Sequence, residues 1–511
     1  MLFNDPVFLF LFLPVTLAGF FLLDLARQRL PSQLWLIGAS LFFYAYWRLD
    51  YTLVLLGSMS TNCLLGWVIV REGQPLRRKL LLVLGVVANL GVIGIFKYLG
   101  FFTELLNLFT GGHRSILHLA LPLGISFFTF EQITYLVDAY RGTTKSYTVV
   151  DFLLFVTFFP RLIAGPIVRP GEIIPQFQEG KGRPDHRQFT IGLTLFLIGL
   201  MEKVLIADTF AGIVEKIFGQ VATGYRPTPL EGWQAAISYT VQLYFDFSGY
   251  SNMAIGLARM FGIILPVNFH SPYRATSLID FWRRWHISLS RFLRDYLYIP
   301  LGGNRKGAVR RYVNLFLTMA IGGLWHGAGL TFLFWGALHG AYLVVNHLWV
   351  SFGPKWRGSP GIAHRAMVAA SRALTLLCVI VGWVFFRSAN FEAATRMLGG
   401  MFDRNSIPAP EALRTVLERI PFLPVRFGDS GNLVDRVLLT LAVAALCWAI
   451  WGPNAQEWLA QVRPTLEPVA TPAGRTWRPS FVVGVALGFG FFLVLTTLVR
   501  AAPGVFLYFN F

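Results

Sequence analysis

Long apolar segments recur from one end of this chain to the other, and they constrain its fold more than any other feature. A membrane-spanning helix needs about 20 mostly apolar residues, and we count about eleven to thirteen hydrophobic segments. Only 14% of the 511 residues are charged, whereas soluble proteins carry about a quarter. We therefore expect an all-α, polytopic integral membrane helix bundle that forms a single domain over residues 1–511.

The links between the first apolar segments carry an orientation signal. Arg27 and Arg29 follow the first segment, and a basic link from Arg71 to Lys79 follows the third, whereas the second and fourth links hold little charge. Because basic loops tend to stay in the cytoplasm, we expect the N-terminus to lie outside it. The same rule accounts for the net charge of +18, which in a soluble protein would suggest a nucleic-acid partner.

Two regions depart from the pattern of simple spans. The run Phe152–Phe159 is too short to cross a membrane and is followed by Pro160, Pro166 and Pro170. A re-entrant or surface hairpin is expected there, because irregular backbone at membrane depth must be buried in protein. Residues from about 388 to 435 form a polar surface insertion, with a possible short helix over Pro410–Arg419.

A polar stripe marks the apolar segment near residues 233–264. Gln242, Asp246 and Tyr250 are spaced by four residues and so share one helical face. Such a stripe should face the bundle interior or a cavity. A structural polar network between helices is an equally good interpretation.

The stretch from Asn268 to Gly340 combines dense charge with histidines in apolar surroundings. His326 lies in the run Gly-Gly-Leu-Trp-His-Gly-Ala-Gly, where small residues let a backbone or a substrate come close. Burial disfavours the imidazolium form, so we expect a neutral His326 that can accept a proton as a general base. A hydrogen-bonded structural histidine at a helix contact is the alternative.

A second histidine, His286, lies in a charged and aromatic segment. If this segment is helical, Asp280 and Arg284 form one ion pair across a turn, and Arg291 and Asp295 form another. The segment then lies at the cytoplasmic face, where its arginines can bind phosphates. A solvated basic loop is the other interpretation.

His339 is harder to place. On one continuous helix it would lie about 20 Å from His326, so the two share a site only if the chain breaks at the glycines after His326. His286 is therefore the preferred companion of His326, and His339 is assigned to packing or support. No metal site, serine-nucleophile elbow or phosphate loop is evident, and the three cysteines fit neither a metal site nor a disulfide framework.

At these residues the sequence resembles the membrane-bound O-acyltransferase (MBOAT) family, and within it the branch of alginate O-acetyltransferase membrane subunits. The matching segments span residues from about 7 to 345, with a motif core at 119–345, and the region after about residue 391 matches loosely. They include LPLGISFFTFEQITYLVDAYRG, FPRLIAGPIVRP, EKVLIADT, QLYFDFSGYSNMAIGLA, FWRRWHISLSRFLRDYLYIPLGGNR and NLFLTMAIGGLWHGAGLTFLFWGALHG.

The resemblance implies a helix bundle with a central funnel, in which His326 and His286 are catalytic. It implies that acetyl passes from a cytoplasmic thioester, acetyl-CoA, across the bacterial inner membrane to an exopolysaccharide such as alginate, or to cellulose or peptidoglycan. A periplasmic partner with a serine hydrolase-like fold completes the transfer. The distribution of basic links, apart from the resemblance, predicts a periplasmic N-terminus. No bound cofactor is implied. The residues expected to bind the donor or line the funnel are Arg283, Arg284, Arg291, Arg294, Asp246, Tyr250 and Trp325.

Several alternatives remain open at this point. His326 acts either as a base or as a covalent acetyl carrier, since histidine can also be a nucleophile. A different class of function is an exporter of polysaccharide or lipid-linked sugar, which also needs a polar cavity in a helix bundle. The absence of an evident internal repeat disfavours a transporter built from inverted halves. A scaffold that only docks a partner would not need His326 at all.

Overall fold

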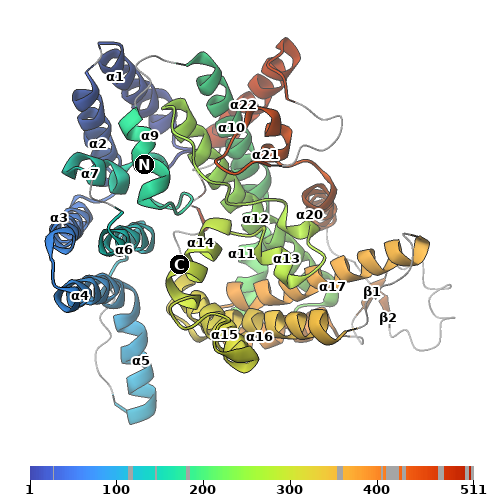
Figure 1. The fold of residues 1–511 in the computed structure, drawn as a ribbon. Helices are drawn as coiled ribbons and strands as arrows, with labels where there is room; N and C mark the ends of the chain where they lie inside the picture. Colours follow the sequence, from blue (N-terminus) through green and yellow to red (C-terminus); the bar gives the residue numbers. More distant parts are fainter. Residues whose placement is uncertain are drawn as a thin grey trace. The chain divides into compact units, whose positions relative to one another are not determined.

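The computed structural model describes most of the chain, namely residues 1–26, 28–112, 119–143, 147–179, 185–353, 361–403, 407–409, 425–427, 433–469, 477–500, 504 and 506–507. Nearly all regular structure in these residues is helical (Figure 1). The strands among them are β1 (Ile407–Ala409) and β2 (Val425–Phe427), a short parallel pair in the predicted insertion. The all-α class is confirmed, and the possible helix over Pro410–Arg419 lies outside the described residues.

The chain divides into two compact units. The first comprises Met1–Met201, Ser248–Asn268 and Ala455–Phe511, and the second comprises Glu202–Phe247 and Phe269–Asn454. Helix α12 (Pro229–Met260) contributes residues to both units.

The first unit is built from helices near both ends of the sequence. Its elements are η1 (Phe8–Phe12), α1 (Leu13–Leu25), α2 (Arg29–Ala45), α3 (Leu49–Arg71), α4 (Pro75–Ile93), η2 (Gly94–Tyr98), α5 (Leu99–Thr110), α6 (Ile125–Arg141), α7 (Val149–Thr157), α8 (Phe159–Leu162), α9 (Pro170–Glu179), α10 (His186–Met201), α21 (Ala455–Trp458), η8 (Ala460–Val462) and α22 (Phe481–Arg500).

The second unit holds the histidine-bearing stretch. Its elements are η3 (Glu202–Ala207), α11 (Asp208–Ala222), η4 (Pro272–Arg274), α13 (Leu278–Trp282), α14 (Ile287–Leu293), η5 (Arg294–Tyr298), α15 (Gly307–His326), α16 (Leu330–Phe352), α17 (Ile362–Arg387), α18 (Phe391–Met401) and α20 (Leu433–Trp451), together with the two strands.

Seven helical segments among the described residues are long and apolar enough to cross a membrane, so a multi-pass membrane protein is confirmed. Other segments that the sequence suggested as spans are shorter, such as α6 with 17 residues, or carry more polar residues, such as α12. The seven segments are Phe8–Leu25, Leu49–Arg71, Pro75–Thr110, His186–Ala222, Ile362–Arg387, Val434–Trp451 and Phe481–Arg500.

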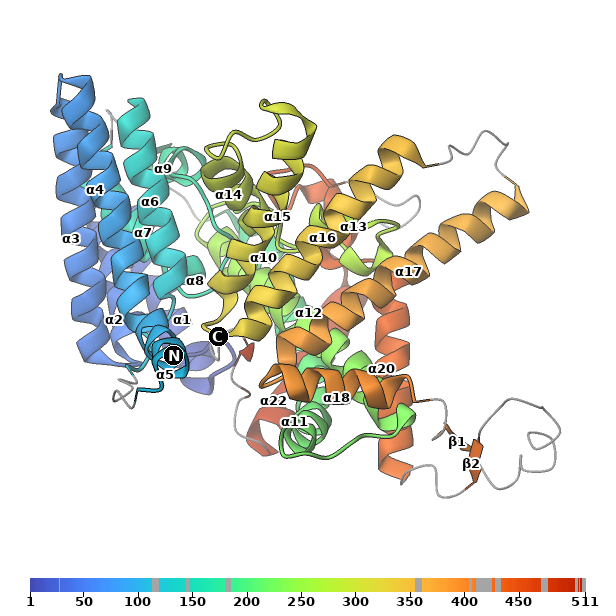
Figure 2. The same cartoon turned by 90° about the horizontal axis from the view of Figure 1, so that it is seen from below.

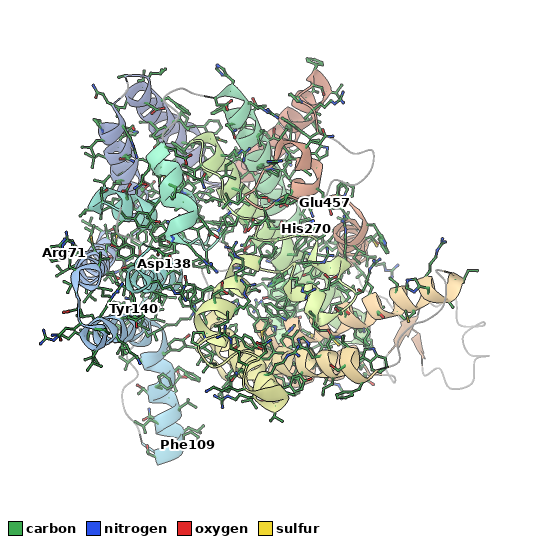
Figure 3. All side chains as sticks on the ribbon, viewed as in Figure 1. Arg71, Phe109, Asp138, Tyr140, His270 and Glu457 are labelled. Atoms are coloured by element: carbon green, nitrogen blue, oxygen red, sulfur yellow. The ribbon has the colours of Figure 1, made fainter. Side chains whose placement is uncertain are left out.

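Large apolar side chains on these segments face outward, as a lipid environment allows. Phe109, near the end of α5 (Figure 3), is 81% exposed, and Leu108 beside it is also exposed. In water such a surface would be an aggregation liability, whereas in a bilayer it contacts acyl chains. Apolar side chains on these helices can be exposed, so a buried side chain there marks a contact with another part of the protein.

Two short helices, α7 and α8, occupy the segment for which a re-entrant or surface hairpin is predicted. A capping box between Thr148 and Asp151 begins α7, and the helix ends at Phe158, whose ψ of 103° is not helical. Every residue of α8 is buried. The irregular backbone is thus enclosed by protein, as its position among spans requires.

Candidate active site

Helices α15 and α16 form a tight antiparallel hairpin that positions His326 (Figure 1). His326 is the last residue of α15, and the glycines at 327 and 329 link it to α16. Gly323 and Gly336 bring the two helices together, because a Cβ on Gly336 would lie 2.3 Å from the Met319 carbonyl oxygen and 2.8 Å from the Gly323 Cα atom. Small residues at such a contact are the usual means of close helix packing in membranes.

Aromatic rings surround the His326 imidazole. Its ring centroid lies 4.8 Å from Trp325, 5.2 Å from Trp335 and 5.3 Å from Phe386, each in an edge-on arrangement. His326 keeps 6% of its surface exposed, whereas His286 and His339 are completely buried. Of these three histidines, His326 is therefore the one that retains exposed surface.

His339 belongs to the same aromatic cluster, which the sequence did not predict. The centroid of the Trp335 ring lies 5.2 Å from that of His326 and 5.0 Å from that of His339. The Trp282 indole N–H donates to Nδ1 of His339 at 3.3 Å, which places the His339 proton on Nε2. The chain reverses at the glycines after His326, so the 20 Å separation of a continuous helix does not apply. A supporting role for His339 is consistent with this geometry.

His286 lies at a break between two helices, so the segment is not one continuous helix. Helix α13 ends at Trp282, and α14 begins at Ile287 with His286 as its N-cap residue. The φ of His286 is +41°, in the left-handed region that non-glycine residues rarely adopt. Such conformations concentrate at functional sites.

The His286 side chain packs among rings within the second unit. Its centroid lies 4.7 Å from Phe247, 6.2 Å from Phe269 and 6.3 Å from Trp325. Burial lowers the pKa of His286 to about 3, so it is neutral at physiological pH. Trp325 thus contacts both predicted catalytic histidines, with His326 at 4.8 Å.

The four predicted arginines differ in their partners. Arg284 forms the expected ion pair with Asp280, with 2.8 Å between Nε and Oδ1, even though the helix ends before it. Arg294 is exposed and pairs with Asp295 at 2.8 Å, and Arg291 is half-buried. Within the described residues Arg283 is exposed and has no acidic partner, so it is the arginine most available to an anionic ligand.

The sequence missed the partner of Asp246, which is Lys203. The Lys203 ammonium lies in η3, is buried, and binds both Asp246 and Asp208, with 2.7 Å to the latter carboxylate. A π-helical turn often marks a functional position. The other predicted funnel residue, Tyr250, belongs to the first unit, where its ring contacts Phe3 at 4.9 Å and Phe506 at 4.5 Å.

A second buried ion pair lies in the first unit, between Glu131 of α6 and Arg161 of α8. Both side chains are almost fully buried, and Arg161 also lies over the Phe155 ring at 4.7 Å. Among the described residues, Nε and Nη2 of Arg161 and Oε2 of Glu131 have no hydrogen-bond partner. Among all the residues that the structure describes, no group of three or more His, Cys, Asp or Glu side chains could hold a metal ion.

Comparison with known proteins identifies the family. The model of the membrane-bound O-acyltransferase family matches residues 111–357. A protein of Pseudomonas aeruginosa named probable alginate O-acetylase AlgI is 44% identical over 498 residues, covering 94% of this chain and 91% of that protein. The chain belongs to the membrane-bound O-acyltransferase family. It is a multi-pass membrane acyltransferase of the O-acetyltransferase type.

Other proteins that are similar to this chain differ in the substrates that their names give. The peptidoglycan O-acetyltransferase of Helicobacter pylori is 42% identical over 435 residues, covering 80% of this chain and 81% of that protein. The teichoic acid D-alanyltransferase of Bacillus subtilis is 26% identical over 288 residues, covering 53% and 69%. The His286 and His326 motifs both fall inside the region that the family model matches.

Proposed function

We propose that this MBOAT protein takes an acetyl group from cytoplasmic acetyl-CoA and passes it across the bacterial inner membrane for O-acetylation of an exopolysaccharide, alginate in the first instance. The observation that carries this proposal is the position of His326, at a helix end in a site lined by aromatic rings. Trp325 contacts both His326 and His286 there. The likeness to a probable alginate O-acetylase over 94% of the chain supports the choice of polymer.

In the proposed reaction His326 acts as a general base. It takes the proton of the acceptor hydroxyl while the hydroxyl oxygen forms a bond to the acetyl carbonyl carbon. The carbon–sulfur bond of the thioester then breaks, and the proton passes to the coenzyme A thiolate, which leaves as the thiol. A positioned base of this kind contributes about 10²–10⁴-fold to the rate.

His286 stabilises or orients the acetyl carbonyl in this scheme. Because its pKa is lowered to about 3 by burial, it remains neutral and can donate only one ring N–H. A donor held in place before the reaction stabilises the oxyanion without reorganisation. Trp325, packed against both imidazoles, keeps them at a fixed separation.

A covalent route through His326 uses the same residues. The imidazole then attacks the thioester, the thiolate leaves with a proton, and the acetyl-imidazole passes its acetyl group to the hydroxyl. Rapid quenching of membranes with labelled acetyl-CoA, followed by peptide mass spectrometry, distinguishes the routes. Acetyl on the peptide that contains His326 supports the covalent route, and its absence during steady turnover supports the base.

The acceptor side of the proposal involves a partner. Acetyl delivered to the outer face has to reach a polymer, and we propose a periplasmic protein with a serine hydrolase-like fold as the recipient, with the N-terminus of this chain on the same side. Peptidoglycan is the second candidate polymer, favoured by the 42% identity to the Helicobacter pylori protein.

The proposal is tested in cells that lack the gene. The wild-type chain and a His326→Ala variant are expressed at matched membrane levels, and the O-acetyl content and the yield of exported polymer are both measured. We expect acetylation to disappear in the variant while the yield is unchanged. Lost export with retained acetylation would support an exporter instead, and an unaffected variant would support a scaffold.

A further inference from the structure

A cavity of about 340 Å³ lies in the first unit, among the ends of helices. It is bordered by the end of α1, the start of α2, α9, the start of α10 and the end of α12, and all of its lining residues belong to that unit. Figure 1 shows α1 and α2 side by side in blue, next to each other along the chain. None of the catalytic candidates in the second unit contributes to it.

The cavity lies beside the ends of two candidate membrane spans. The candidate span Phe8–Leu25 ends beside it, and the candidate span beginning at His186 starts beside it. The ends of spanning helices lie at the boundary between hydrocarbon and water. Leu22, Leu25 and Leu193 are exposed on these same helices, so the surface next to the cavity faces acyl chains.

The lining has two chemically distinct parts. Its apolar part includes the rings of Phe20, Phe21 and Phe261. Its charged part carries four carboxylates and one guanidinium, a formal charge of −4 + 1 = −3. The charged residues are Asp24, Glu172, Glu179, Asp185 and Arg29. In a chain whose net charge is +18, this acidic lining is a local reversal of sign.

Hydrogen bonds fix the walls of the cavity. Arg29 and Gln33 of α2 both donate to the Phe177 carbonyl oxygen of α9, at 3.3 Å and 3.2 Å. Gln176 donates to the Ile264 carbonyl oxygen at 2.9 Å and accepts from the Ile264 N–H at 2.8 Å. The space between these elements is therefore held open by contacts that span several helices, rather than by one flexible loop.

Some of the charge at this cavity has no partner in the part of the chain that the structure describes. Among the described residues, the Asp24 and Glu179 carboxylates and the Arg29 guanidinium have no ion-pair partner. The Oε1 atom of Gln188, also in the lining, is buried and has no hydrogen-bond partner in this part of the chain. Buried polar atoms are nearly always satisfied, so the Gln188 oxygen indicates an occupant that donates a hydrogen bond. The accessible carboxylates of Asp24 and Glu179 favour an occupant that also carries positive charge.

We propose that the cavity binds a phospholipid with a primary ammonium headgroup, such as phosphatidylethanolamine. The ammonium lies against the carboxylates Asp24 and Glu179 and donates to Gln188, while Arg29 binds the phosphate. The glycerol and the first methylenes contact Phe20 and Phe21, and the acyl chains follow the exposed leucines into the bilayer. An acidic lining repels coenzyme A and anionic lipids, so this site is separate from the acetyl donor and does not depend on the proposed function.

The test is lipid retention by the full-length protein. The protein is purified in mild detergent, exposed to equal amounts of phosphatidylethanolamine, phosphatidylcholine and phosphatidylglycerol, and examined by native mass spectrometry. We expect phosphatidylethanolamine to be retained preferentially by the wild type. An Asp24→Asn, Glu179→Gln variant should reduce this preference about tenfold, which corresponds to about 1.4 kcal/mol.

Matched controls keep the experiment decisive. A Glu72→Gln, Glu104→Gln variant removes two acidic residues outside the cavity and should retain the lipid preference. A Gln33→Trp variant fills the cavity from its rim and should lose the lipid while the protein remains monodisperse. Equal retention of phosphatidylglycerol and phosphatidylethanolamine, or an unchanged preference in the Asp24 and Glu179 variant, would overturn the proposal.

Discussion

Two buried polar clusters, one in each unit, show different uses of polarity in a membrane protein. In the first unit, side chains of α3, α4 and α6 form an amide network in which Asn62 donates to Gln132 at 2.5 Å and Asn89 donates to Asn62 at 2.6 Å (Figure 2 shows the three helices together). In the second, histidines of α15 and α16 pack among indole and phenyl rings. The first cluster joins helices, whereas the second presents imidazoles in a ring-lined site.

The largest expected effect is on the rate of transfer in the histidine cluster. A His326→Ala variant should lose about 10²–10⁴-fold in acetyl transfer per folded molecule, because the base is removed. Transfer of labelled acetyl from acetyl-CoA is measured in purified membranes, normalised to folded protein. His186→Ala, at an exposed histidine on α10, is the control. A loss of less than about threefold in His326→Ala would remove it from the chemistry.

The next effect concerns the hairpin that positions this cluster. A Gly336→Ala variant places a methyl group 2.3 Å from the Met319 carbonyl oxygen, and overpacking of this kind costs about 1–3 kcal/mol. Thermal unfolding in detergent should occur at a lower temperature. Gly91→Ala, where no atom lies within 4 Å of the added carbon, should be neutral or stabilise α4 by about 0.5–1 kcal/mol. Equal melting of the two variants would contradict the proposed helix contact.

A substitution in the amide network should lower the stability and leave the rate of acetyl transfer unchanged, whereas one at His326 should lower the rate. Asn62→Leu removes hydrogen bonds between α3, α4 and α6, each contributing about 0.6 kcal/mol and up to about 1.7 in membrane proteins. The unfolding temperature should fall while transfer per folded molecule is retained. Thr61→Ala, on the exposed side of the same helix, should change neither. A loss of transfer in Asn62→Leu without loss of stability would break the distinction between the clusters.

The smallest effect is expected at the surface arginines. Arg283→Gln should raise the KM for acetyl-CoA about twofold to fivefold, since exposed charge pairs contribute up to about 1 kcal/mol. Initial rates in inside-out vesicles over a range of acetyl-CoA concentrations measure it. Arg294→Gln should have less effect, because Arg294 is already paired with Asp295. If both variants keep the wild-type KM, neither arginine binds the donor.

Sequence patterns predicted the parts of this molecule that depend on local composition. The span at Phe8–Leu25 and the broken helices after residue 152 follow from hydropathy and proline placement. The choice of His326 followed from its glycine-rich surroundings, and the structure places it beside Trp335 and Phe386. These are properties that neighbouring residues determine.

Most of the features that the sequence did not reveal depend on contact between distant parts of the chain. Lys203 and Asp246 are 43 residues apart, and Glu131 and Arg161 are 30 apart, so spacing along one helix says nothing about either pair. His339 lies in the histidine cluster because α16 packs antiparallel to α15. The break before α14 depends on an unusual backbone at His286 that no periodicity reveals.

The positive φ of His286 makes it difficult to separate the role of its imidazole from that of its backbone by substitution. Only glycine, asparagine and aspartate tolerate a left-handed φ readily, so a β-branched replacement would perturb the turn together with the imidazole. His286→Asn keeps the chain path while deleting the ring, and His286→Gly relaxes the path as well. Libraries at this site should therefore be ranked by backbone tolerance first and by side-chain chemistry second, or a folding defect will be mistaken for lost catalysis.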